Sequence, residues 1–103
     1  MSSDHSYWVY MVSNNTRSAL YIGVTNGLLK RVAQHRAGAV PGFTQHYHCI
    51  HLVYFEQFRD VRLAIAREKQ LKGWRREKKN ALIGKKNPHW LDLALEMNAE
   101  DGE

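Results

Sequence analysis

Residues 7–24, YWVYMVSNNTRSALYIGV, contain two apolar stretches that flank a polar turn. Residues 7–12 and 19–24 are rich in aromatic and β-branched side chains, which favour strands. Asn14 and Asn15 suit the turn, because a short amide side chain bonds to nearby backbone and tolerates left-handed conformations. The segment therefore predicts a β-hairpin.

A short helix, a loop and a third strand follow the predicted hairpin. Apolar residues recur at helical spacing over residues 28–36, which predicts a helix. Two glycines and a proline within residues 38–42 predict a loop that we expect to be mobile. The run IHLVYF, residues 50–55, predicts the third strand.

Three further helices are predicted after this strand. Asp60 is a candidate N-cap for the first of them. The second covers residues 74–83 and is expected to end near Gly84. A short docking helix over residues 90–97 precedes an acidic tail at residues 98–103.

The predicted element order identifies the fold class. Strands and helices follow one another as β, β, α, β, α, α, which predicts an α+β domain: a small antiparallel sheet with helices packed on it. A chain of 103 residues fits one compact domain, and no internal repeat or linker divides it. We expect a single domain over residues 1–97, followed by the acidic tail.

The composition limits the classes of protein to consider. A single cysteine, Cys49, cannot form an internal disulfide. The first residues lack the pattern of a secretory signal, and no apolar run approaches the roughly eighteen residues that span a bilayer. We therefore expect a cytoplasmic protein and exclude a membrane protein.

Positive charge is concentrated in one part of the chain. The formal net charge is +5, and ten of the fifteen Lys and Arg residues fall between Arg62 and Lys86. Five of the ten acidic residues fall in the last twelve. Such a basic segment attracts polyanions, although it is also common as an ordinary solvated face.

Glu68 stands out because it shares the predicted inward side of its helix with Ala64 and Leu71. One interpretation is an i,i+4 ion pair with Lys72, which stabilises a helix by about 0.2–0.5 kcal/mol. The other is a partly buried carboxylate that binds a hard cation such as Mg²⁺. Taken alone, this position favours the ion pair.

Two further pairs are candidates for a shared site. Arg31 and His35 lie four residues apart on one side of a predicted helix, where they could hold a phosphate together. Tyr10 and Tyr21 lie on the two strands of the hairpin, where cross-strand neighbours approach closely. A polar helix stripe and ordinary aromatic packing are the competing interpretations of these pairs.

A zinc site is argued against, although four possible ligands fall within six residues. They are His46, His48, Cys49 and His51. If this segment is an extended strand, the first two side chains face one side of it and the last two face the other. They would then be unable to converge on one ion.

The order and spacing of these residues resemble the GIY-YIG nuclease superfamily over nearly the whole chain. Trp8-Val9-Tyr10 stands in the place of the first motif, with Trp and Val instead of Gly and Ile, and Tyr21-Ile22-Gly23 matches the second literally. The segments AIAREKQLKGWRREKKNALI and NPHW resemble the compact, free-standing branch that is related to the nuclease module of excinuclease.

The resemblance implies a three-stranded antiparallel sheet flanked by helices and a set of catalytic residues on one face. That set is Tyr10, Tyr21, Arg31, His35 and Glu68. Glu68 would hold one Mg²⁺ or Mn²⁺ ion, Arg31 a phosphate oxygen, and a tyrosine, with Tyr21 preferred, would help to deprotonate water. Contacts to flanking phosphates are expected from Lys30, Lys69, Lys72, Arg75 and Arg76.

The resemblance thus predicts a metal-dependent endonuclease that hydrolyses phosphodiester bonds, with DNA favoured over RNA and DNA repair or recombination as its setting. The first alternative is a non-catalytic nucleic-acid-binding or accessory module that keeps the fold. A small protein-interaction adaptor is a third class, in which the basic helices are only solvated surface.

Overall fold

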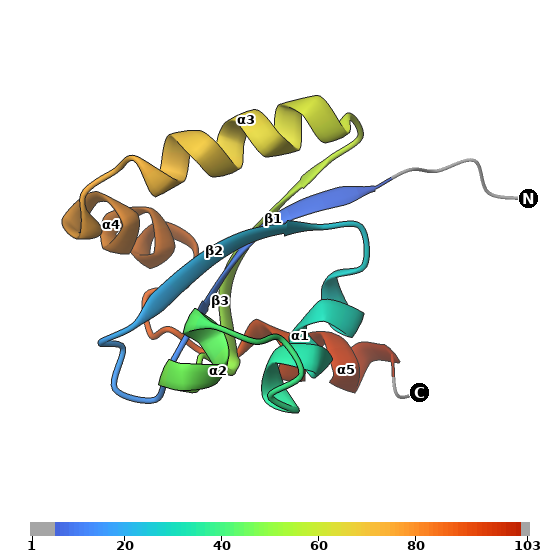
Figure 1. Ribbon diagram of the computed structural model, residues 1–103, viewed down its shortest axis with the longest axis vertical. Helices are drawn as coiled ribbons and strands as arrows, with labels where there is room; N and C mark the ends of the chain where they lie inside the picture. The colour runs from blue at the N-terminus through green and yellow to red at the C-terminus, as the bar shows by residue number, and fades with distance from the viewer. Residues whose placement is uncertain (1–5, 102–103) are drawn as a thin grey trace, which may run out of the picture.

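The computed structural model describes the chain from residue 6 to residue 101 and its side chains as far as Met97. It has the predicted α+β architecture, with three strands and five helices among the described residues (Figure 1). These elements are β1 (Tyr7–Ser13), β2 (Leu20–Thr25), α1 (Leu28–Arg36), α2 (Phe43–Tyr47), β3 (His51–Phe58), α3 (Val61–Lys72), α4 (Arg76–Lys86) and α5 (Leu93–Asp101).

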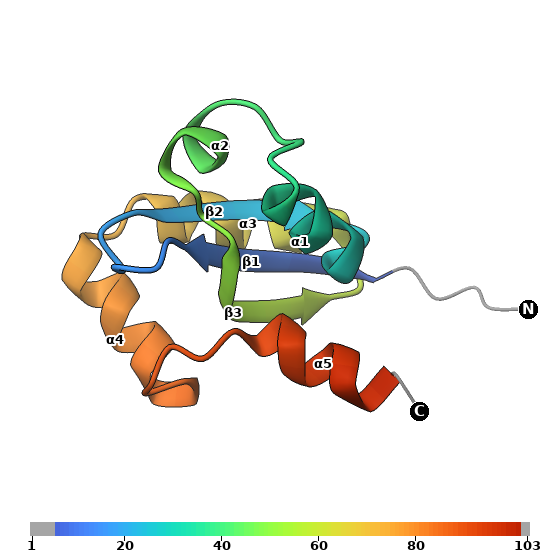
Figure 2. The same ribbon diagram turned by 90° about the horizontal axis from the view of Figure 1, so that it is seen from below.

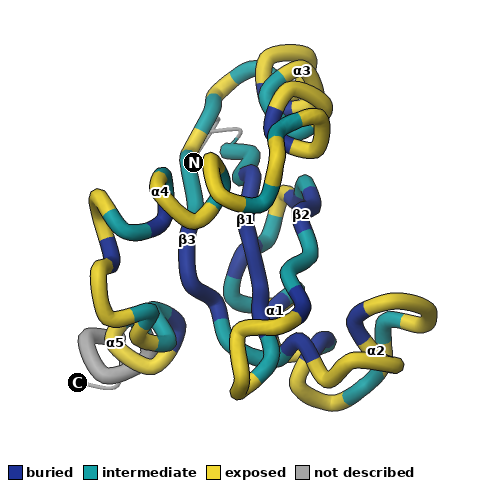
Figure 3. Tube along the Cα trace, turned by 90° about the vertical axis from the view of Figure 1, so that its left-hand side faces the viewer, coloured by how far each residue is buried: buried dark blue, intermediate teal, exposed yellow. Residues whose placement is uncertain are grey.

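The sheet is antiparallel, with the strand order β2-β1-β3. β1 is therefore the central strand, and its residues 9–12 are fully buried (Figure 3). The register places Tyr10 between Gly23 on β2 and Phe55 on β3. The hairpin and the three-stranded sheet that the sequence predicts are both confirmed.

Helices cover both faces of the sheet (Figures 1 and 2). Alternation along β1 sends Val9 and Met11 to one face, where they pack with Leu71 of α3 and Ile83 of α4. The neighbouring residues of β1, Tyr10 among them, face the other side and join a second cluster with residues of α1 and α5. No helix among residues 6–101 has the length and apolar character to cross a membrane.

The segment predicted as a loop before β3 contains a short helix, α2. It lies between Gly42, with φ of 97°, and His48, with φ of 57°. The sequence gives little sign of it, because five residues are too few for an apolar period and no side chain caps its N-terminus. Tertiary contact stabilises it instead, since the hydroxyl of Thr44 is buried against His35.

The turn of the hairpin also differs from the expectation. Its left-handed residue is Arg17, with φ of 62°, rather than either asparagine. Asn14 still organises the turn, because its side chain accepts a bond from the backbone N–H of Ala19 at 3.0 Å and donates one to Ser18 at 2.9 Å.

Two predicted helix boundaries were wrong. α4 continues through Gly84 to Lys86, because one interior glycine costs only about 1 kcal/mol while Ile83 beside it is fully buried. α5 begins at Leu93 instead of Trp90 and reaches Asp101, so helical backbone extends into the acidic segment. The N-cap at Asp60 is confirmed, since its carboxylate accepts a bond from the N–H of Arg62 at 2.9 Å.

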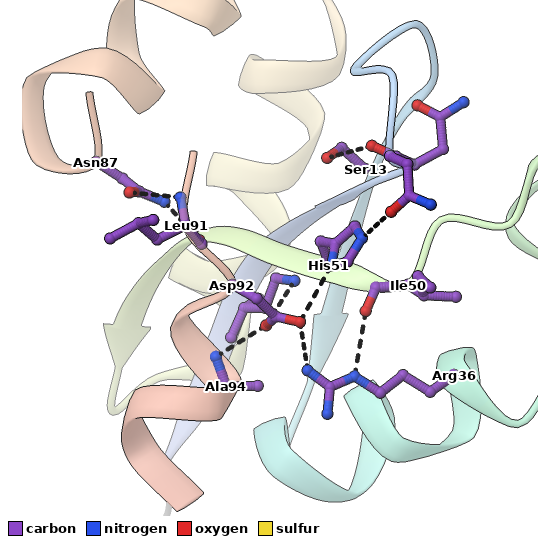
Figure 4. A network of polar contacts seen from close by, with 11 residues as sticks. Ser13, Arg36, Ile50, His51, Asn87, Leu91, Asp92 and Ala94 are labelled. Atoms are coloured by element: carbon purple, nitrogen blue, oxygen red, sulfur yellow. Dashed lines mark hydrogen bonds and ion pairs between the residues drawn. The ribbon is translucent and has the colours of Figure 1, made fainter. Parts of the chain in front are cut away.

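The side chain of Asp92 joins α1, β3 and α5 (Figure 4). One carboxylate oxygen accepts bonds from the N–H of Ala94 at 3.1 Å and of Leu52 at 3.3 Å. The other oxygen pairs with Arg36 and lies 3.2 Å from Nδ1 of His51. Asp92 therefore acts as the N-terminal cap of α5 and fixes this helix against the sheet.

Candidate active site

Gly23 makes room for the phenol of Tyr10 on the adjacent strand. The two residues are cross-strand partners, and a Cβ atom added at Gly23 would lie 2.5 Å from the Tyr10 hydroxyl oxygen. Such an approach is far closer than van der Waals contact permits, so only glycine fits at this position while Tyr10 keeps its place. The glycine of the Tyr21-Ile22-Gly23 motif thus positions the tyrosine of the first motif.

A buried chain of hydrogen bonds connects Tyr10 to α1 and α2. The Tyr10 hydroxyl lies 2.9 Å from Nε2 of His35, and Nδ1 of His35 lies 3.0 Å from the hydroxyl of Thr44. Thr44 donates its own hydrogen to the carbonyl of Val40 at 3.4 Å, so it accepts one from Nδ1. The network therefore assigns the Nδ1–H tautomer to His35, and Tyr10 donates its proton to Nε2.

Arg31 and Glu68 both act electrostatically on this buried phenol. Burial raises the pKa of Tyr10 to about 12, and the charges of Tyr21 and Glu68 add to that effect while the guanidinium of Arg31 opposes it. Burial also lowers the pKa of His35, and the positive charge of Arg31 lowers it further. Tyr10 is consequently protonated and His35 neutral near pH 7.

Tyr21 lies beside this pair but is only partly buried. Its ring centroid is 6.4 Å from that of Tyr10 and 5.8 Å from that of His35. The ammonium of Lys72 lies 5.9 Å from the centroid of the Tyr21 ring. Tyr21 is therefore the phenol of the pair that solvent reaches, with a cation from α3 over its ring.

Glu68 forms an ion pair with Lys72, at 2.9 Å between Nζ and the carboxylate. This is the i,i+4 pair that the sequence favours when the position is considered alone. The Glu68 side chain is nevertheless only 17% exposed. Through Lys72 over Tyr21, and through its effect on the pKa of Tyr10, its carboxylate belongs to the same group as the two phenols.

The basic residues proposed to contact phosphates divide into two groups. Four are exposed at the surface: Lys30 of α1, Lys69 and Lys72 of α3, and Arg75 at the start of α4. Arg76 differs, because its guanidinium donates to the carbonyls of Arg17 and Ser18 in the hairpin turn, the latter at 3.2 Å, and to Asn80 at 3.0 Å. Arg76 therefore attaches α4 to the hairpin.

A zinc site was argued against on the assumption of an extended strand, and that assumption was wrong. His46 lies on α2 and His48 ends it, while Cys49 is buried and His51 bonds to Asp92. Among the residues that the structure describes, no three or more His, Cys, Asp or Glu side chains group as metal ligands. Glu68 is thus an isolated carboxylate in its part of the fold.

Several residues next to Tyr21 are absent from the sequence prediction. Phe43 stacks on the Tyr21 ring at 6.3 Å, Tyr47 lies 4.7 Å beyond Phe43, and Thr44 holds His35. All three belong to α2, so they had no predicted element to place them. Lys79 of α4 was also missed, and it lines a pocket together with Tyr21 and Phe43.

Known proteins are similar to this chain over most of its length. The family described as the GIY-YIG catalytic domain matches residues 6–81. A UPF0213 protein of Clostridium perfringens is 38% identical over 91 residues, which cover 88% of this chain and 97% of that protein. A UPF0213 protein of Haloquadratum walsbyi is 37% identical over 76 residues, covering 74% of this chain and 84% of the relative.

A solved structure shares the fold. The solution NMR structure of a UPF0213 protein from Bacillus halodurans matches with a TM-score of 0.55 and covers 85% of this chain and 93% of that one. The two sequences are 23% identical, so the likeness supports the fold alone.

Proposed function

The chain belongs to the GIY-YIG family of catalytic domains, and on this premise we propose that it is a metal-dependent endonuclease that hydrolyses phosphodiester bonds, with DNA favoured over RNA. One observation carries the proposal: Tyr10, Tyr21 and His35 have ring centroids within 6.4 Å of each other, and Arg31 and Glu68 both act on the same Tyr10 phenol. We also propose a cytoplasmic location and a role in DNA repair or recombination.

Arg31 and Tyr21 have separate tasks in the proposed reaction. The guanidinium of Arg31 holds a nonbridging phosphate oxygen and offsets the negative charge that grows in the transition state. Tyr21 helps to remove a proton from the attacking water, because its hydroxyl is the one that solvent reaches. Tyr10 is fully buried and donates its proton to His35, so these two residues orient the site.

The donor set fits one hard divalent cation. Magnesium keeps most of its water and needs one or two carboxylates together with substrate phosphate oxygens, and Glu68 supplies one carboxylate. Glu68 would hold Mg²⁺ or Mn²⁺ once Lys72 releases it to contact a phosphate. The bound ion would polarise the scissile phosphate and stabilise charge on the leaving oxygen.

A non-catalytic nucleic-acid-binding module is the second candidate. The observation that favours it is the 2.9 Å ion pair between Lys72 and Glu68, since a carboxylate already paired with an ammonium is a weaker cation ligand. Both candidates bind nucleic acid. They differ in whether Glu68 takes part in turnover.

Cleavage of labelled DNA and RNA with and without Mg²⁺ tests the proposal. Glu68→Ala is expected to abolish cleavage while folding and nucleic-acid affinity stay near those of the wild type. Arg31→Ala is expected to reduce turnover by about 10²- to 10³-fold with a smaller effect on binding. Glu96→Ala on α5 is the matched control for removing an exposed acid, and it should cleave normally.

Each result has a clear meaning. Wild-type rates in Glu68→Ala would remove this residue from the mechanism. Salt-sensitive binding without cleavage by the wild type, under every metal tested, would establish the non-catalytic module instead.

A further inference from the structure

Helix α2 presents two exposed aromatic rings next to the candidate active site. Phe43 and Tyr47 lie four residues apart, so their side chains emerge on the same side, with ring centroids 4.7 Å apart. They are 44% and 47% exposed. α2 lies beyond β2, on the side of the sheet that carries α1 (Figure 2).

These rings continue from Tyr21 without a break. The Phe43 ring stacks on Tyr21 at 6.3 Å, with an angle of 28° between the ring planes. Tyr21, Phe43 and Tyr47 therefore form a row of aromatic rings that begins in the site and ends at the surface. We call these three residues the aromatic platform.

A pocket of about 260 Å³ adjoins the inner end of the platform. Tyr21, Phe43 and the β2 residues Leu20 and Ile22 supply its apolar walls, and the other lining residues are Lys72 of α3 and Lys79 of α4. Its volume is below the roughly 300–1,000 Å³ typical of drug-sized ligands, so a single planar ring system suits it better than a larger group.

The combination of flat rings and two ammonium groups selects a specific chemistry. Large exposed aromatic side chains cost free energy in water unless they serve contact with a ligand or partner. Nucleic-acid proteins that hold unpaired strands combine aromatic rings, on which bases stack, with cations that follow the backbone. A base inside a duplex is already stacked on its neighbours and does not offer its faces to such a surface.

We propose that the aromatic platform stacks an unpaired base next to the phosphate that is cut, so that the preferred substrate has a single-stranded segment at the cleavage site. This inference rests on the proposed nuclease function, because Tyr21 belongs to both the platform and the reacting site. Phe43 holds the base, Tyr47 extends the stack outward, and Lys72 and Lys79 contact the phosphates on either side.

Binding without cleavage tests the platform separately from catalysis. In a Glu68→Ala background, the probes are a single-stranded DNA oligonucleotide with one 2-aminopurine base and the matching blunt duplex. The fluorescence of 2-aminopurine falls when it stacks on another ring. Phe43→Ala is expected to weaken binding of the single strand by roughly 5- to 150-fold and to remove the quenching. Binding of the duplex should change by less than about twofold.

Two further variants control for surface and shape. Leu95→Ala removes an apolar side chain of comparable exposure from α5, 59% against 44% for Phe43, and should leave both affinities unchanged. Phe43→Trp keeps a stacking ring and should retain the single-strand preference. Equal loss of single-strand and duplex affinity in Phe43→Ala would overturn the platform as a base-stacking site.

The remaining outcomes separate this inference from the proposed function. Phe43-dependent quenching in a protein that cuts no substrate supports the platform and rejects the nuclease. Metal-dependent cleavage that disappears in Glu68→Ala, with single-strand affinity unaffected by Phe43→Ala, does the reverse. A dimer in sedimentation that Phe43→Ala converts to a monomer, without change in DNA affinity, would identify the rings as an interface between two copies of the chain and overturn the proposal.

Discussion

At the scale of single residues, the position of one phenol depends on the absence of one methyl group. Tyr10 is fully buried in the second core cluster, and its hydroxyl passes over Gly23 on the way to His35. The same side chain therefore packs the core and faces the site. Any shift of the ring is expected to change both stability and the hydrogen bond to the histidine.

Two glycine-to-alanine substitutions test this dependence with opposite signs. Gly23→Ala places its methyl against the buried Tyr10 ring and is expected to destabilise the protein by about 1–3 kcal/mol. Gly84→Ala, inside α4 with nothing within 4 Å of the added Cβ, is expected to stabilise it by about 0.5–1 kcal/mol. Urea denaturation measures both changes. A Gly23→Ala protein as stable as the wild type would show that Tyr10 can move freely.

The pH dependence of stability follows from the buried imidazole of His35. Because its pKa is lower in the folded protein than the ordinary 6.5, the unfolded chain binds this proton first as the pH falls. The associated stability is present above about pH 6.5 and is lost as the pH falls through that value. Urea midpoints at pH 7.5 and 5.5 should therefore differ more in the wild type than in His35→Gln, which keeps the other five histidines. Equal differences in the two proteins would contradict this assignment.

The sequence predicts the identity of these residues better than their connections. The motif pattern identifies Tyr10, Tyr21, Arg31, His35 and Glu68, and their catalytic roles stay a prediction. The bond from His35 to Thr44 had no signal, because both the helix that carries Thr44 and its distance from α1 depend on tertiary packing. Gly23 belongs to a recognisable motif, but its contact with Tyr10 depends on the cross-strand register.

At the scale of elements, Asp92 holds the last helix in place. It is only 7% exposed, caps α5, and pairs with Arg36 of α1, while its contact with the N–H of Leu52 reaches β3. Its partners on α1 and β3 lie forty or more residues away in the chain. Local sequence therefore predicted the cap at Asp60, whose partner is two residues away, and missed the one at Asp92.

Removing this carboxylate should loosen α5 specifically. Asp92→Ala is expected to destabilise the protein by about 2–4 kcal/mol, because it removes a helix cap and leaves Arg36 without its partner. Asp92→Asn keeps an oxygen for the cap but loses the charge, so a smaller loss is expected. Urea denaturation gives the magnitudes, and hydrogen exchange locates them. Unchanged amide protection in α5 of Asp92→Ala would contradict the role of this residue.

The helix boundaries show where local rules fail. A glycine at position 84 predicts the end of a helix, but the burial of Ile83 beside it outweighs the cost of one glycine, and the helix continues to Lys86. The side chain of Asn87 then bonds to Val53 and to both backbone groups of Leu91, which turns the chain away. The predicted domain boundary at residue 97 stays a prediction.

At the scale of the whole molecule, positive charge lies on the elements that flank the site. Lys69 on α3 and Arg75 at the start of α4 are exposed, and Lys30 is exposed on α1 next to Arg31. A strand bound near Tyr21 would have cations on either side of it. The charge asymmetry was visible in the sequence, whereas its arrangement around the site required the fold.

The salt dependence of nucleic-acid binding reports on these cations. Removing one cation that touches a phosphate should reduce the slope of log K against log salt by about 0.7 for a single strand or 0.9 for a duplex. Lys69→Ala and Arg75→Ala are each expected to show about this reduction. Arg62→Ala is the control, because Arg62 pairs with Asp60 at the other end of α3. Slopes equal to that of the wild type in both test variants would show that neither residue touches a phosphate.

The double role of Tyr10 has a consequence for recognising inactive relatives. Because this tyrosine is packed in the core, a lineage that abandons chemistry would still be under selection to keep it for folding. Arg31 and Glu68 are partly exposed and lie outside both core clusters, so they can drift without unfolding the domain. Across homologues, the tyrosine therefore diagnoses the architecture, and the arginine and glutamate diagnose turnover.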